Sequence, residues 1–245
     1  MRLNEPERAN ALSPRMLGEL TELYRQDHRA DGVRAILLTA AGKHFSGGAD
    51  LEHLARLKDA GAEENRRDSE RLRGLFEAVL RQEALTIAAV QGACVAGGCG
   101  LATAHDFVVA GRGARFLYSE ARIGFVAALV ATFLPFRLRG ADIRELLLNP
   151  DFVDAERALE IGLVNRLAED ERLEEGARKL ADEILTRASS ESIARTKRLL
   201  LELPGRPLGE ALEHAAAANA EARATDDCRH GIATFLETKK PPRWR

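Results

Sequence analysis

The sequence predicts an α/β fold that is followed by a helical C-terminal region. Four strand-like runs alternate with helical patterns up to about residue 170, and they span 33–40, 86–91, 106–110 and 114–119. From residue 172 onward no run has strand character, and apolar residues recur at helical spacing. A chain of 245 residues with 45% hydrophobic content can bury a substantial core, so we expect one large domain or one domain with an appendage.

Charge and cysteine content exclude several function classes. Lys and Arg total 36 against 38 Asp and Glu, so net charge gives no reason to expect a nucleic acid or an anionic membrane as partner. No apolar run is long enough to cross a membrane, and the start of the chain lacks the apolar stretch of a signal peptide. Cys94, Cys99 and Cys228 lack paired metal-ligand spacing, which favours buried, reduced thiols over a disulfide or zinc framework. A cytoplasmic location is therefore expected.

Two long helices are expected in the α/β part. Ser13 followed by Pro14 marks a helix start, because Ser can cap the first turn and Pro fits the first helical position. The pattern of this helix continues to about Ala30. A second helix over about 63–83 is indicated by an apolar stripe at helical spacing, formed by Leu72, Leu75, Phe76, Val79 and Leu80.

Two glycine-rich turns each lead from a strand-like run into a helical pattern. In "FSGGADL" (45–51), Gly47 and Gly48 allow tight turning and Asp50 can cap the helix that follows. In "VQGACVAGGCGLATAHD" (90–106), a helix of small residues starts near Gly98. Both turns would leave free backbone N–H groups at a helix N-terminus, so each is a candidate site for an anion.

The glycines alone leave other interpretations open. They can simply be tight turns. A phosphate-binding loop is excluded, because no Gly-Lys-Ser/Thr follows either cluster. A dinucleotide fingerprint is approximated by Gly98, Gly100 and Thr103, with Glu120 twenty residues on, but its last small residue is wrong.

Four longer stretches of the chain carry a recognisable pattern: "LNEPERANALS", "VRAILLTAAGKHFSGGADL", "IAAVQGACVAGGCGLATAHDFVVAGRGARFLYSEARIGF" and "ERALEIGLVNRL". Together they resemble successive signatures of the crotonase superfamily of enoyl-CoA hydratases and isomerases, and they occur in the family's order. The resemblance extends to the closing "FLETKKPPRW" and so covers nearly the whole chain. Its closest likeness is to members of the methylglutaconyl-CoA hydratase type.

This resemblance implies the fold, the substrate and the assembly. It implies a catalytic spiral of ββα units over 1–171 and a helical region over 172–245 that serves assembly and closes the CoA pocket. The implied substrate is an acyl-CoA thioester, with no metal or redox cofactor, and the implied assembly is a homotrimer or a dimer of trimers. Family members generally have two short strands before "LNEPE", where this chain begins, so we expect the sheet edge there to be exposed or covered by a neighbour.

The resemblance also explains why two glycine-rich turns are needed. In the family, a thioester carbonyl lies between two backbone N–H donors, and the matching positions are Ala49 and Gly97. Such an oxyanion hole stabilises charge on the thioester oxygen while a proton leaves or joins the adjacent carbon. Glu120 matches one of two family carboxylates, whereas Gly100 stands where hydratases usually have the other. Glu120 is therefore the expected proton-transfer group, its pKa raised by the apolar residues that follow it.

Contacts to the CoA part of the substrate follow from the same resemblance. Arg8 matches a position where the family often has a basic residue near the CoA phosphates. Lys239 and Lys240 lie where the C-terminal segment approaches the nucleotide. The other positions matched to substrate and CoA binding are Ala9, Ala11, Gly48 and Asp50.

The missing acid at Gly100 leaves the reaction open. Addition of water across a conjugated double bond is well served by two carboxylates, whereas moving a double bond from the 3- to the 2-position needs one base. The likeness to methylglutaconyl-type hydratases, several of which lack the same acid, places hydration first. We expect Gly100 to leave room for an acyl branch or carboxylate, so it is a reaction-tuning position. The alternatives are a Δ3,Δ2-enoyl-CoA isomerase and a non-catalytic acyl-CoA-binding protein.

Overall fold

The computed structural model describes residues 1–244 and divides into two compact units. The first unit comprises residues 1–26, 36–80 and 86–178. The second comprises residues 27–35, 81–85 and 179–245. None of the helices within the described part of the chain combines the length and the apolar character needed to cross a bilayer.

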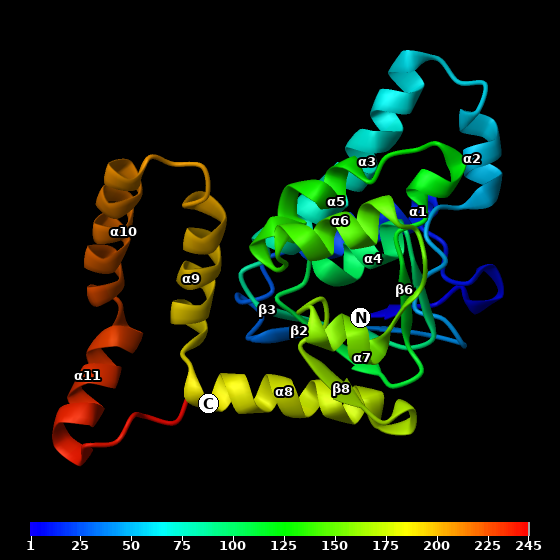
Figure 1. Ribbon diagram of the computed structural model, residues 1–245. Coiled ribbons are helices and arrows are strands. Elements are labelled where there is room, and N and C mark those ends of the chain that lie inside the picture. The colour runs from blue at the N-terminus through cyan, green and yellow to red at the C-terminus, as the bar shows by residue number, and fades with distance from the viewer. Residues whose placement is uncertain (245) are drawn as a thin grey trace. The chain divides into compact units, whose positions relative to one another are not determined.

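Two sheets form the framework of the first unit (Figure 1). The larger has the order β1-β2-β3-β5-β8, with the bounds β1 Arg2–Leu3, β2 Ala35–Ala40, β3 Leu85–Val90, β5 Phe107–Gly111 and β8 Arg166–Ala168. The smaller has the order β4-β6-β7, with the bounds β4 Ala93–Val95, β6 Arg115–Leu117 and β7 Val153–Asp154. β3 is buried along its whole length and pairs in parallel with β5, as a strand covered on both faces should. The predicted α/β class is thereby confirmed.

The helices of the first unit surround these strands. They are η1 Pro6–Arg8, α1 Pro14–Arg25, α2 Leu51–Leu57, α3 Ala62–Arg81, α4 Gly97–Thr103, η2 Glu120–Ile123, α5 Ala128–Phe133, η3 Leu134–Phe136, α6 Gly140–Leu148, α7 Ala155–Glu160 and η4 Asp170–Arg172. The predicted helix over 63–83 is confirmed within two residues at each end by α3, and α4 starts one residue before the predicted Gly98.

The first long helix starts where the sequence predicted and ends earlier. The Met16 N–H donates to Ser13 Oγ at 3.2 Å, which is the expected N-cap. α1 ends at Arg25, so the predicted continuation to Ala30 is wrong. Gln26 is extended, with ψ 144°, and the Asp27 carboxylate accepts the Arg29 N–H at 3.1 Å. A side chain that offers the backbone a local turn competes with the helix at this point.

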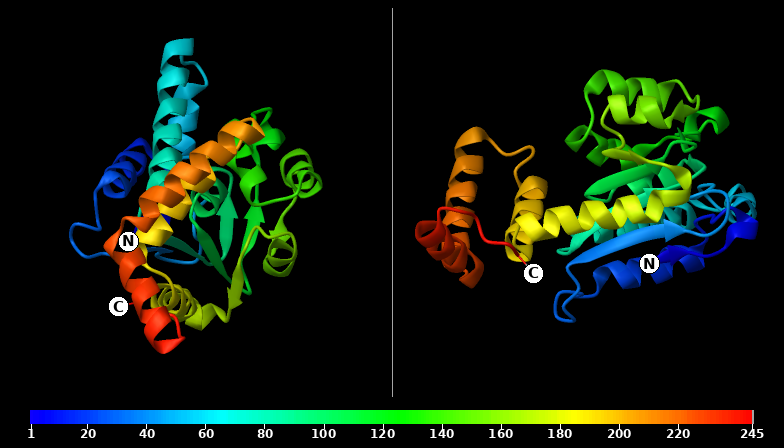
Figure 2. Two further views of the ribbon diagram at one scale, coloured as in Figure 1. Left: turned by 90° about the vertical axis from the view of Figure 1, so that its left-hand side faces the viewer. Right: turned by 90° about the horizontal axis from the view of Figure 1, so that it is seen from below.

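Between residues 179 and 244, the regular structure of the second unit is entirely helical, as predicted for the region after residue 172. α8 Leu173–Arg187 leads into it, followed by α9 Ser190–Glu202, α10 Leu208–Arg223 and α11 Asp226–Thr238. Figure 2 shows α10, in orange, beside α9. Neither α10 nor α11 has a buried residue, and large apolar side chains are exposed at Leu200, Leu208, Leu212, Ile232, Phe235 and Leu236.

Ion pairs connect the short segments of the second unit to α9. Arg29 pairs with both Glu83 and Glu191, and Arg198 pairs with Glu83 at 2.6 Å. The Lys197 ammonium donates to the Ala84 carbonyl oxygen at 2.7 Å. Charged side chains therefore contribute contacts within the second unit, whose last two helices, α10 and α11, contain no buried residue.

Candidate active site

The two glycine-rich turns pack directly against each other. Gly48 has a positive φ of 86°, and a Cβ built on it would lie 2.8 Å from the Val95 carbonyl oxygen. A Cβ on Gly98 would lie 2.7 Å from Ser46 Cβ. The Val95 N–H donates to the Ser46 carbonyl oxygen at 2.9 Å. Glycine is needed at positions 48 and 98 because the backbones approach too closely for a side chain.

The backbone N–H groups of Ala49 and Gly97 are both left without an acceptor among residues 1–244. The neighbouring groups are engaged: the Leu12 N–H donates to the Gly48 carbonyl oxygen at 2.7 Å. Gly97 is the first residue of α4, where helix geometry supplies no internal acceptor. Each turn therefore presents one free N–H at the place where the sequence predicted an oxyanion donor.

Ala96, which precedes Gly97, has a strained backbone. Its φ of 47° and ψ of −119° lie outside the regions that residues with a Cβ usually adopt. The Ala96 N–H is anchored by a 2.7 Å hydrogen bond to the Leu117 carbonyl oxygen. Strain of this kind persists only where surrounding contacts hold it, and here it sets the direction in which α4 begins.

Glu120 leaves the same end of the small sheet as Gly97. β4 and β6 are parallel, with Val95 opposite Leu117. Parallel strands end at the same edge, so the residues that follow Val95 and Leu117 emerge side by side. The packing of strands β4 and β6 thus brings the Gly97 turn and the Glu120 segment together, although they are distant in the sequence.

The Glu120 carboxyl group is half-buried, and its Oε2 atom is buried without a hydrogen-bond partner among the described residues. Burial raises the pKa of Glu120 above its ordinary value, while a hydrogen bond from its own backbone N–H opposes the increase. The predicted direction of the pKa shift is confirmed. Of the apolar residues expected to desolvate it, Val130 is buried, whereas Ile123 and Phe125 are exposed. A buried carboxyl oxygen without a partner is suited to exchange a proton with a bound molecule.

Gly100 does not border open space, and the predicted room beside it is wrong. A Cβ built on Gly100 would lie 2.5 Å from Phe76 Cζ and 2.7 Å from Val130 Cγ1. Phe76 in turn packs edge-to-face on Phe133, with ring centroids 5.6 Å apart. The sequence identified Phe76 only as part of a core stripe, because nothing local links it to Gly100.

Arg8 and the segment after it pack on the first glycine turn. The Arg8 guanidinium contacts Asp50 at 2.8 Å and Glu52 at 3.0 Å. Asp50 is buried and caps α2, as predicted, by accepting the Glu52 N–H at 2.9 Å. Ala9 adopts a left-handed conformation and accepts the Gly47 N–H at 2.8 Å. Arg8 is therefore already paired with two carboxylates beside the turn that carries Ala49.

The remaining predicted contacts are distributed along the chain. The Ala11 N–H donates to the Arg8 carbonyl oxygen at 3.1 Å, so Ala11 belongs to the same turn. Lys239 ends α11 in a left-handed conformation with φ 56°, and Lys240 follows it in the second unit, both exposed. Their role at the nucleotide stays a prediction. Cys94, Cys99 and Cys228 are free thiols, as predicted, but only Cys94 and Cys99 are buried. Cys228 is partly exposed on α11, so the prediction that it is buried is wrong.

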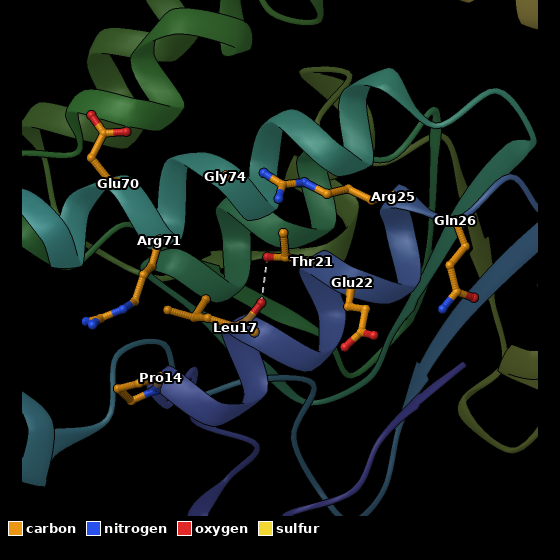
Figure 3. A pocket seen from close by; sticks show the side chains of 10 residues that line it. Pro14, Leu17, Thr21, Glu22, Arg25, Gln26, Glu70, Arg71 and Gly74 are labelled. Carbon is orange, nitrogen blue, oxygen red and sulfur yellow. Dashed lines mark hydrogen bonds between the residues drawn. The ribbon is translucent and has the colours of Figure 1, made fainter.

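A separate cavity of about 570 Å³ lies between α1 and α3. Its walls combine apolar and small residues with a charged rim, and the lining residues are Pro14, Leu17, Gly18, Thr21, Glu22, Arg25, Gln26, Glu70, Arg71 and Gly74. Figure 3 shows Arg25 reaching across to Gly74, where a built Cβ would lie 3.5 Å from the guanidinium. No residue of the glycine turns or of the Glu120 segment lines this cavity. It is distinct from the candidate site.

The chain is similar to several known proteins over nearly its whole length. A Thermus thermophilus protein provisionally named enoyl-CoA hydratase is 46% identical over 242 residues, which cover 99% of this chain and 95% of that protein. The 1,2-epoxyphenylacetyl-CoA isomerase of Escherichia coli is 29% identical over 98% of this chain and 92% of the length of that isomerase. The crystal structure of an enoyl-CoA hydratase from Mycobacterium smegmatis superposes with a TM-score of 0.90 at 29% identity, over 99% of this chain and 93% of that one.

A family profile described as "Enoyl-CoA hydratase/isomerase" matches residues 1–245. The fold is the one that the sequence resemblance implied. The crotonase-type architecture is therefore confirmed. This chain belongs to the enoyl-CoA hydratase/isomerase family and is an enzyme of that family.

Proposed function

We propose that this enzyme adds water across the double bond of a 2-enoyl-CoA thioester, using the Ala49 and Gly97 N–H groups as an oxyanion hole and Glu120 as the proton-transfer group. One observation carries the proposal. A buried carboxyl oxygen of Glu120, which has no partner among residues 1–244, follows β6, and the neighbouring strand leads to the Gly97 N–H, which has no acceptor among those residues. A polarised carbonyl and one mobile proton are the requirements of the reaction.

The chemistry can be completed with these groups. The Glu120 carboxylate takes a proton from water as the water oxygen forms a bond to the β-carbon. The electron pair of the double bond shifts, and negative charge develops on the thioester oxygen between the two N–H groups. The α-carbon then takes the proton from Glu120, which regenerates the carboxylate. Each preorganised donor is worth about 3–4 kcal/mol in the transition state.

Isomerisation of a 3-enoyl to a 2-enoyl thioester is the second candidate. Glu120 would remove a proton from the α-carbon and return it to the γ-carbon. Between these two steps, the negative charge on the thioester oxygen would be stabilised by the same two N–H groups. The side chains nearest to a Cβ at position 100, Phe76 and Val130, are apolar, and this favours the alternative because no carboxylate stands at position 100 to orient water. The family is described as one of hydratases and isomerases, and the Escherichia coli relative is named as an isomerase, although of an epoxyphenylacetyl-CoA. A non-catalytic acyl-CoA-binding role is disfavoured by the placement of Glu120.

Assembly and substrate contacts form the finer part of the proposal. Exposed apolar side chains on α9, α10 and α11, among them Leu200, Leu212 and Phe235, support association of copies as a homotrimer or a dimer of trimers. Arg8 would approach the CoA phosphates. The chemistry uses hydrogen bonds and one carboxylate, so it needs no metal or redox cofactor. We place the enzyme in the cytoplasm.

Ultraviolet absorbance of the conjugated thioester tests the proposal. The purified protein is mixed separately with crotonyl-CoA and with 3-hexenoyl-CoA. Hydration removes the absorbance of crotonyl-CoA, whereas isomerisation creates absorbance from 3-hexenoyl-CoA. We expect loss of the crotonyl-CoA band. Rapid conversion of 3-hexenoyl-CoA without hydration of either thioester would establish the isomerase instead, and no change with either would favour the binding protein.

A further inference from the structure

The volume that a side chain at position 100 would occupy is filled from two other helices. Phe76 comes from α3 and Val130 from α5, and both would stand closer than 3.0 Å to a Cβ at Gly100. A Cβ that close is essentially never tolerated without movement of its neighbour. Gly100, Phe76 and Val130 thus fit together as one set, and we call their shared surface the apolar wall.

The apolar wall is held firmly. Phe76 and Val130 are each 3% exposed, and Phe133, which packs on Phe76, is 5% exposed. Phe76 comes from α3, Val130 and Phe133 come from α5, and α4 contributes the backbone of Gly100. Because close-packed interiors yield little to small forces, the wall cannot swing aside for a substrate group without losing contacts.

The wall lies at the edge of the candidate site. Gly100 follows Gly97 by three residues on α4, so the two lie on neighbouring positions of one helix face. The Gly100 N–H donates to the Ala96 carbonyl oxygen at 3.2 Å, which connects the wall to the strained turn. Val130 lies on the helix that follows the Glu120 segment. The wall therefore joins the helix of the oxyanion donor to the segment of the base.

We propose that Phe76 and Val130 form the part of the acyl pocket that faces the β-carbon, and that they restrict the enzyme to acyl groups with an uncharged, apolar substituent there. This inference rests on the proposed function and specifies its substrate class. A carboxylate placed against Phe76 and Val130 would lose its hydration without gaining a hydrogen bond. An alkyl chain would instead gain apolar contact. Dicarboxylic acyl groups are thus excluded.

Two matched pairs of CoA thioesters test the wall. The pair for turnover is crotonyl-CoA and 3-methylglutaconyl-CoA, and the pair for binding is butyryl-CoA and glutaryl-CoA, measured by calorimetry. The wild-type protein should prefer the uncharged member of each pair. Phe76→Ala and Val130→Ala should reduce that preference, by about 10-fold for Phe76→Ala. Leu38→Ala, a fully buried change on β2, is the control for general loss of packing and should leave the preference unchanged.

The binding pair keeps this test independent of the reaction type. If wild-type protein turns over neither enoyl-CoA but still prefers butyryl-CoA, and Phe76→Ala weakens that preference, the proposed reaction fails and the wall stands. Equal preferences in wild-type, Phe76→Ala and Val130→Ala proteins would show that these side chains belong to the core alone. If Phe76→Ala does not fold, Phe76→Leu and Val130→Ala decide the question. A wild-type preference for the carboxylated members would overturn the inference directly.

Discussion

The Ala96 N–H donates a 2.7 Å hydrogen bond to the Leu117 carbonyl oxygen, and this bond joins the two strand ends from which Gly97 and Glu120 leave. The relative position of the proposed oxyanion donor and the proposed base therefore depends on backbone pairing between two short strands. Catalytic groups placed by strand ends are held more accurately than groups carried on free loops. The strained φ of Ala96 is a local cost of this arrangement.

Replacing the Glu120 carboxyl group should abolish most turnover. Glu120→Gln keeps the size of the side chain but cannot accept and return a proton, so kcat should fall about 100-fold or more. Binding of a CoA thioester should change little, because the proposed CoA contacts are elsewhere. The measurement is steady-state kinetics with crotonyl-CoA together with calorimetric binding of butyryl-CoA. Glu63→Gln, at an exposed site on α3, is the matched control. Near-wild-type kcat in Glu120→Gln would remove Glu120 from the mechanism.

The raised pKa of Glu120 should appear in two pH profiles. Hydration requires the carboxylate, so kcat/KM should fall as pH decreases through the raised pKa of the folded enzyme. Stability should respond in the opposite sense. The folded state holds the Glu120 proton more tightly than the unfolded state, so protonation of Glu120 stabilises the fold, and this stabilisation is fully present below the ordinary pKa of glutamate. The stabilisation is lost as pH rises through the pKa that Glu120 has in the folded state. Glu120→Gln should flatten this part of the stability profile, measured by urea unfolding. Identical stability profiles for the two proteins would contradict the shift.

Removing the Gly97 N–H should impair catalysis without removing the carboxylate. Gly97→Pro deletes the donor, and Pro at the first position of a helix removes no hydrogen bond within that helix. We expect kcat/KM to fall about 100-fold or more. Gly97→Ala is the matched control, because it retains the N–H and adds only a Cβ, 3.2 Å from Leu12 Cδ1. Circular dichroism and oligomer size check that each variant folds. Full activity in a folded Gly97→Pro protein would place the oxyanion hole elsewhere.

Local rules predicted much of this fold and of the candidate site. Ser13 and Asp50 cap the helices that follow them because capping depends on side chains within three residues of the helix start. The glycine turns were found for the same reason, since tight backbone approach leaves a mark in the sequence itself. The family resemblance supplied the roles of Ala49, Gly97 and Glu120, which spacing alone leaves open.

Long-range packing accounts for what the sequence did not predict. Phe76 and Gly100 meet only after α3 and α4 are placed on the sheet, so a glycine that indicated empty space turned out to be covered. Arg8 likewise is paired with Asp50 and Glu52, which come from a distant segment. The early end of α1 depends on the competing turn at Asp27. Periodicity cannot reveal which side chain fills a gap left by another element.

The Asp50 carboxylate should stabilise the first glycine turn. It caps α2 and pairs with Arg8 while buried, so Asp50→Ala should lower the free energy of unfolding by about 1–2 kcal/mol. Asp50→Asn keeps an oxygen that can cap the helix and should lose less. Because Ala49 precedes this residue, kcat/KM should fall with stability in Asp50→Ala. Urea unfolding and crotonyl-CoA kinetics give the two quantities. Equal stability of Asp50→Ala and wild-type protein would mean that the cap and the ion pair contribute nothing measurable.

Restoring a carboxylate at position 100 should fail unless the apolar wall is opened. In Gly100→Glu the new Cβ would overlap Phe76 Cζ at 2.5 Å and Val130 Cγ1 at 2.7 Å. Overpacking of this kind costs about 1–3 kcal/mol of stability, and crotonyl-CoA hydration should decrease. Phe76→Ala alone should also destabilise the protein, because it leaves a cavity. The double variant, Gly100→Glu with Phe76→Ala, should nevertheless be more stable than the sum of the two single effects predicts. The coupling free energy from urea unfolding of all four proteins measures this compensation. Additive effects, or increased hydration by Gly100→Glu alone, would mean that Phe76 yields readily and that position 100 is open after all.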